Sequence, residues 1–133
     1  MTNALVSSRL RILVLLMLTA IVLVDIGISI YHFNTGGVPS GITESILAFI
    51  IPLSWYLVYI AQRYEPASND YIACRITGLF LIFAAAIILL AFGIYHFGTP
   101  TGTRSGAIET SLAFSLIVLD VLLYIIYKRP TGT

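Results

Sequence analysis

Charged residues and cysteine are both scarce in this chain. Lys, Arg, Asp and Glu together make up 10% of its 133 residues, whereas a soluble domain carries about 25%. This scarcity excludes an ordinary soluble domain, and a formal net charge of +1 is too small for a nucleic-acid-binding face. The single cysteine, Cys74, excludes an internal disulfide and a thiolate metal cluster.

Catalytic motifs are also missing. The sequence has no glycine-rich phosphate loop, no nucleophile elbow and no clustered Ser/His/Asp arrangement. It leaves no room for a separate soluble domain that could hold such a site. We therefore expect that the chain is not an enzyme on its own, while membership of an enzyme complex stays open.

Hydrophobic residues, by contrast, make up 59% of the chain, and its mean hydropathy is +0.99. A membrane-crossing helix needs about 20 largely apolar residues. Four segments meet this requirement, at about 11–33, 43–62, 75–97 and 108–127. The sequence therefore predicts a single transmembrane domain over residues 1–133, an all-α integral membrane four-helix bundle.

A short stretch of the chain occurs twice. Residues 30–33 read Ile-Tyr-His-Phe and recur at 94–97. Three following positions recur as well: Ser40, Gly41 and Glu44 match Ser105, Gly106 and Glu109. The match predicts the internal duplication of a helical hairpin, with repeat 1 at about 11–63, repeat 2 at about 75–128 and a polar link at 63–74. Each repeat has two spans, so both hairpins have the same orientation.

The basic residues predict which way the hairpins face. One side of the predicted membrane carries Arg9, Arg11, Arg63, Arg75, Lys128 and Arg129, and the other side carries only Arg104. Short loops rich in Lys and Arg stay in the cytoplasm. We therefore expect both termini and the link to be cytoplasmic, and the two tight turns to lie outside the cell membrane.

Asp25 and Asp120 are acids inside predicted spans, where a charge costs about 2.5–3.5 kcal/mol near the helix centre. With a rise of 1.5 Å per residue, Asp25 lies about 10 Å inward from His32, and Asp120 lies about 16 Å inward from Glu109. Two hypotheses follow. The acids form a proton or cation site, or they make interhelical hydrogen bonds or contact a partner subunit. Candidate hydrogen-bond partners within the chain are Thr19, Ser29, Ser54 and a carbonyl freed by Pro52.

His32 and His96 occupy the same outer level of the two repeats, with Glu44 and Glu109 near the starts of the neighbouring helices. Two His and two carboxylates suit zinc, iron or manganese, and two facing His suit axial haem ligation. The alternative is structural: His belongs to an aromatic belt, and Glu in a first helical turn favours the helix dipole. We expect no cofactor other than bound lipid, with a metal ion or haem as the alternative.

Several residues are expected to shape the helices. Ser40 or Gly41 is predicted to cap the second helix, and Pro52 is predicted to kink it. Small residues allow close helix approach, so the third helix is expected to pack tightly against a neighbour. Its small residues include Gly78, Ala84, Ala85 and Ala86.

Short loops and small-residue faces are typical of a non-catalytic accessory subunit of a larger membrane complex, such as a respiratory or other energy-converting one. Its partners would be other membrane subunits or copies of itself, together with lipids. One alternative is a small oligomeric transporter or channel that uses Asp25 and Asp120. Another is a self-assembling lattice protein. The layout of two apolar helices around a Gly/Thr/Ser-rich turn resembles that of lipid-associated coat proteins and pilins.

Overall fold

The computed structural model describes residues 2–127, and their side chains from residue 8 onward. The described residues form four helices: α1 (Thr2–Asn34), α2 (Val38–Ala61), α3 (Asn69–Phe97) and α4 (Thr103–Ile126). All four are long and apolar enough to cross a membrane. The predicted all-α, four-helix architecture is therefore confirmed.

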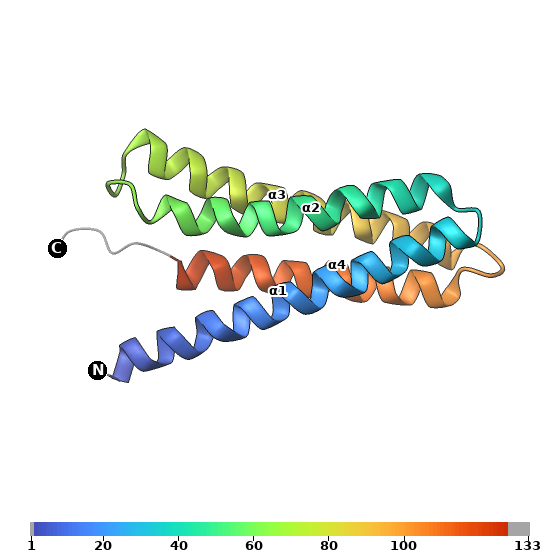
Figure 1. Cartoon of the computed structure of the whole chain (residues 1–133), viewed down its shortest axis with the longest axis horizontal. Helices are drawn as coiled ribbons and strands as arrows, with labels where there is room; N and C mark the ends of the chain where they lie inside the picture. Colours follow the sequence, from blue (N-terminus) through green and yellow to red (C-terminus); the bar gives the residue numbers. More distant parts are fainter. Residues whose placement is uncertain (1, 128–133) are drawn as a thin grey trace.

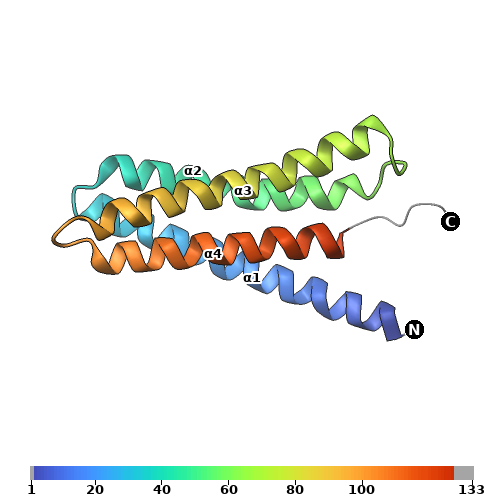
Figure 2. The ribbon, with the colours of Figure 1, turned by 180° about the vertical axis from the view of Figure 1, so that it is seen from behind.

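The helices run up and down, each packed against its neighbour along the chain, and α4 closes the ring against α1 (Figure 1). The tight turns at residues 35–37 and 98–102 lie at one end of the bundle, which we call the turn end. The α2–α3 link and the start of α1 lie at the opposite end, which we call the link end. The first half of α1 diverges from the other helices in both views (Figure 2).

Core positions recur every seven residues along each helix, a spacing typical of left-handed helical bundles. Starting at the turn end, this spacing defines three successive layers of buried or nearly buried side chains. The histidine layer contains His32, Glu44, His96 and Glu109. The aspartate layer contains Asp25, Ile51, Leu89 and Leu116, and the next layer contains Leu18, Val58, Ile82 and Leu123. Polar groups in these layers are therefore concentrated toward the turn end.

Two glycines allow α3 to approach its neighbours closely. A Cβ on Gly78 would lie 2.6 Å from the Ser54 carbonyl oxygen of α2. A Cβ on Gly93 would lie 3.1 Å from the Gly106 carbonyl oxygen of α4. Only a residue without a side chain fits such contacts between backbones. Among the neighbouring small residues, Ala85 and Ala86 are buried and Ala84 is half-buried.

The helix starts differ from the predicted ones. α2 begins at Val38 with Gly37 as its N-cap, so the prediction that Ser40 or Gly41 caps this helix is wrong. Pro39 explains the earlier start, because proline fits the first helical turn, where its missing N–H costs nothing. Glu44 consequently lies beyond the first turn, and its burial needs another explanation than the helix dipole.

α3 also begins earlier than expected, because Ser68 accepts a hydrogen bond from the Tyr71 backbone N–H at 3.1 Å and caps the helix. The second half of the predicted 63–74 link is therefore helical. α2 continues through Pro52.

Candidate functional site: a histidine–glutamate cluster

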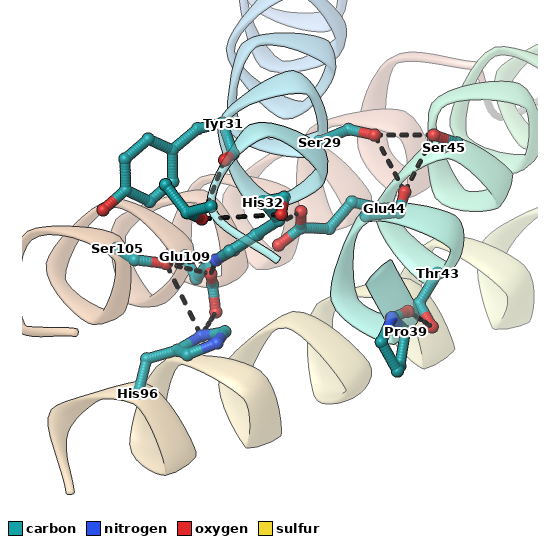
Figure 3. A network of polar contacts seen from close by, with 12 residues as sticks. Ser29, Tyr31, His32, Pro39, Thr43, Glu44, Ser45, His96, Ser105 and Glu109 are labelled. Carbon is teal, nitrogen blue, oxygen red and sulfur yellow. Dashed lines mark hydrogen bonds and ion pairs between the residues drawn. The ribbon is translucent and has the colours of Figure 1, made fainter. Parts of the chain in front are cut away.

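Each hairpin makes the same polar contact at the turn end. His32 Nδ1 lies 2.7 Å from Glu44 Oε2 in the first hairpin. His96 Nδ1 lies 2.8 Å from Glu109 Oε2 in the second (Figure 3). In both cases the histidine lies in the last turn of one helix and the glutamate lies in the second turn of the next, so the tight turn between the helices brings the pair together.

The two hairpins meet through these same side chains. The imidazole rings of His32 and His96 are stacked, with centroids 4.7 Å apart and planes at 19°. Ser105 Oγ lies 2.8 Å from His32 Nε2 and donates a hydrogen bond to Glu109 Oε1 at 2.5 Å. The cluster therefore links α1, α2, α3 and α4 at one level of the bundle.

The cluster is withdrawn from solvent and rich in acceptors. Glu44 and Glu109 are fully buried, and the side chains of His32 and His96 are only 5% and 12% exposed. Within residues 8–127 the ion-pair partners of these carboxylates are the two histidines, with no Lys or Arg among them. Buried carboxylates require compensation by protons or by a cation.

Three of these side chains could hold a metal ion. Ligand atoms of His32, His96 and Glu109 all lie within 4.8 Å of one another. Tetrahedral zinc ligands at their usual bond lengths are about 3.4 Å apart, so small side-chain movements would complete such a site. Glu44 holds His32 through Nδ1 and leaves Nε2 facing Glu109, at 3.5 Å from Oε1. A carboxylate that orients a ligating histidine in this way is a regular feature of metal sites.

Haem does not fit this arrangement. Axial haem ligation requires two imidazole nitrogens pointing at each other across an iron atom. The rings of His32 and His96 instead lie face to face, with centroids 4.7 Å apart, and a macrocycle has no room between them.

A cavity of about 700 Å³ lies over the histidine pair. Its polar lining includes His32, His96 and Ser105, and its apolar lining includes Ile88 and Phe92. All four helices contribute to its walls. The cluster is thus accessible to a ligand although its carboxylates are buried.

The predicted intramembrane acids do not form a pair. Asp25 is fully buried on the interior face of α1, and neither of its oxygens has a hydrogen-bond partner within the described part of the chain. Ser29, a predicted partner, donates instead to the Gly41 carbonyl at 2.8 Å. Asp120 is half-buried on α4, and its Oδ1 also lacks a partner there.

Ser105 is the site residue that sequence reasoning missed. In the sequence analysis Ser105 served only as a marker of the repeat, and its counterpart Ser40 was assigned only a possible capping role. The spacing of the two residues could have predicted a contact between Ser105 and Glu109. Ser105 precedes Glu109 by four residues, and residues at that spacing share a helix face. No family model, curated protein or solved structure matches the chain.

Proposed function

We propose that the protein binds one divalent transition-metal ion at the turn end of a membrane-embedded four-helix bundle. The observation that carries this proposal is the convergence of ligand atoms from His32, His96 and Glu109 within 4.8 Å. Two imidazoles and one carboxylate suit zinc, iron(II) or manganese(II).

Each residue of the cluster has a distinct role in this proposal. His32 Nε2, His96 Nδ1 and Glu109 supply the bonds to the ion. Glu44 orients His32 and supplies a second negative charge without binding the ion. Ser105 contacts both His32 and Glu109 and keeps their ligand atoms facing each other. His32, His96 and Ser105 also line the cavity, from which the ion and further ligands would reach the site.

Charge balance supports the same proposal. A divalent ion with two neutral histidines would compensate the two buried glutamates, and it would do so without leaving excess charge within the histidine layer. Bound protons could compensate the charge of the glutamates instead, so protons should compete with the ion. The affinity for the metal is therefore expected to fall as the pH is lowered, because the imidazole nitrogens take up protons.

The duplication and the membrane orientation enter the proposal as supporting hypotheses. The His–Glu contact made twice, at 2.7 Å and 2.8 Å, supports a duplicated hairpin. The distribution of Lys and Arg supports a cytoplasmic link end. The turn end would then face the outside of the cell membrane and take its ion from there.

Metal titration tests the proposal. Protein stripped with a chelator and transferred to phosphatidylcholine nanodiscs should bind about one Zn²⁺ or Co²⁺ per chain. Because these are the chain's two histidines, the double variant His32→Ala/His96→Ala should lose this binding. Asp120→Asn is the matched control and should bind as the wild type does. Unchanged stoichiometry in the double variant would overturn the proposal.

An accessory-subunit function is a second candidate, favoured by a groove between α1 and α4. Gly27 lines this groove, and a Cβ there would have nothing within 4 Å; Ser111 and Ser115 line an adjoining groove that shares Val24 with it. Small residues on an open face allow a partner's helix to approach closely. Gly27→Leu should then release a co-purifying membrane protein in mild detergent, and a wild-type chain that purifies alone would contradict this candidate.

The transporter and lattice hypotheses stay predictions. Beneath Asp25 the next core layer consists of Leu18, Val58, Ile82 and Leu123, all apolar, and this arrangement lends the transport hypothesis no support.

A further inference from the structure

The cavity over the histidines extends sideways along α3. Its wall includes Ile88, Ala91, Phe92 and Tyr95, in addition to His96. Ile88 precedes His96 by eight residues, which corresponds to about 12 Å of helix. Ile88 is 38% exposed and Tyr95 is 66% exposed on the outer face of the bundle. The cavity therefore opens laterally, toward the surface that a membrane would cover, as well as toward the turn end.

At the turn end, away from the apolar wall formed by Ile88 and Phe92, the lining of the cavity is polar and carries little negative charge. It is lined by the imidazoles and by the hydroxyl groups of Thr35, Thr99 and Thr101, and no Asp or Glu of the described chain lines it. Gly37 and Gly102, the N-caps of α2 and α4, also line it, so two positive helix ends add to its potential. The Thr35 and Thr99 hydroxyls already donate to the backbone carbonyls of Tyr31 and His96, so it is the two helix N-termini, together with the proposed ion, that favour an oxygen-rich, negatively charged group.

We infer that this cavity binds a membrane-dissolved amphiphile with a carboxylate head, such as a fatty acid. The inference rests on the proposed metal site. One carboxylate oxygen fills a free coordination position of the ion, and the apolar tail lies along Ile88 and Phe92. No bond within the ligand is made or broken.

The first hairpin provides a matched surface for comparison. Val24, Gly27, Ile28 and Tyr31 line a groove beside α4, and each precedes its counterpart on α3 by 64 residues: Ile88, Ala91, Phe92 and Tyr95. This groove is lined by neither histidine. The two grooves share Tyr31 and Ser105, but Gly27 lines only the groove beside α4 and Ala91 lines only the cavity over the histidines. Both positions are exposed, so a bulky side chain at each is expected to obstruct mainly the groove that it lines.

Cobalt spectroscopy tests the inference. Co²⁺-loaded protein in phosphatidylcholine nanodiscs is titrated with decanoate, and the visible Co²⁺ absorption reports the coordination of the ion. We expect decanoate to change the spectrum at concentrations about tenfold or more below those that acetate requires. Ala91→Phe should raise the decanoate concentration needed by about tenfold or more, and Gly27→Phe should leave it unchanged.

The outcomes separate this inference from the proposed function. If the wild-type protein does not bind Co²⁺, the proposed metal site itself is contradicted. Co²⁺ binding with no spectral response to decanoate, or an equal effect of both Phe substitutions, overturns the amphiphile inference alone. Because Ala91→Phe could disturb folding, the Co²⁺ affinity of this variant must first be shown to match that of the wild type. Ile88→Trp provides a second obstruction of the same cavity, farther from His96 along α3.

Discussion

The two hairpins share a sequence pattern but differ in how they are packed. In the second hairpin, Arg75 is buried and donates hydrogen bonds to the backbone carbonyls of Tyr124 and Tyr127. Its counterpart in the first hairpin, Arg11, lies over the Tyr127 ring at 5.2 Å from the centroid and makes no hydrogen bond within residues 8–127. The second hairpin thus closes on itself at the link end. Similar sequences take different structural roles because each copy has different neighbours.

The hairpins also differ directly beneath the histidines. Seven residues inward, His32 is followed by Asp25, whereas His96 is followed by Leu89, and both side chains are fully buried. At the histidine level Glu44 Oε2 lies 2.7 Å from Nδ1 of its own hairpin's His32, while Glu109 also lies 3.5 Å from His32 Nε2 of the other hairpin. Within the part of the chain that the structure describes, the first hairpin therefore carries the buried acid without a hydrogen-bond partner, and the second carries the glutamate that lies near both histidines.

Glycine contacts should give the largest difference between the hairpins. Gly78→Val places a side chain against the Ser54 backbone and should lower the free energy of unfolding by about 3 kcal/mol or more, the upper end of overpacking costs. Gly27→Val, with open space around it, should change it by less than about 1 kcal/mol. Chemical denaturation in detergent measures both, and equal effects would show that α1 is packed as closely as α3.

The next largest effect on stability is expected from substitutions at Asp25 and Leu89, the residues beneath the two histidines. Asp25→Leu makes the aspartate layer fully apolar and should raise the free energy of unfolding by about 1–4 kcal/mol, since an uncompensated buried carboxyl is removed. Leu89→Asp buries a second acid and should lower the free energy of unfolding. Thermal unfolding in nanodiscs compares the two, and a destabilised Asp25→Leu variant would mean that Asp25 has a stabilising partner outside this chain.

The two arginines should differ by a smaller amount. Arg75→Leu removes charged hydrogen bonds to the last turn of α4 and should cost about 1.5–3 kcal/mol. Arg11→Leu removes only a contact with an aromatic ring and should cost about 0.5–1 kcal/mol. Hydrogen exchange of the α4 C-terminal amides provides the readout. Greater loss of protection in Arg11→Leu would reverse the proposed roles.

The last comparison concerns the two glutamates, of which Glu44 only orients its histidine in the proposed site. Glu44→Gln should weaken Zn²⁺ binding about 10–100-fold, or about 1.4–2.7 kcal/mol. Glu109→Gln, which removes a direct ligand, should weaken it further. Competition with a chelating dye measures both affinities. If Glu44→Gln has the larger effect, the two glutamates exchange roles and the ion lies nearer the first hairpin.

Much of the site's location could be predicted from the sequence. His32 and His96 fall at equivalent helix ends, so two like-oriented hairpins bring them to one end of the bundle. Ser105 escaped notice because a serine in an apolar chain has no distinctive pattern until its neighbours are known. The cap of α2 was misplaced because Ser40 fits the cap preference, while Pro39 also fits the start of a helix, and local preference alone does not choose between them.

The amino-acid sequence by itself determined that four apolar helices form, because so hydrophobic a chain must satisfy its backbone hydrogen bonds internally. It also determined that both His–Glu pairs lie beside tight turns. Only the tertiary structure decided which imidazole nitrogen faces which carboxylate, that Ser105 joins the two hairpins and that Asp25 has no hydrogen-bond partner among the described residues. Those contacts depend on the rotation and separation of neighbouring helices, which glycines such as Gly78 and Gly93 set through close backbone packing.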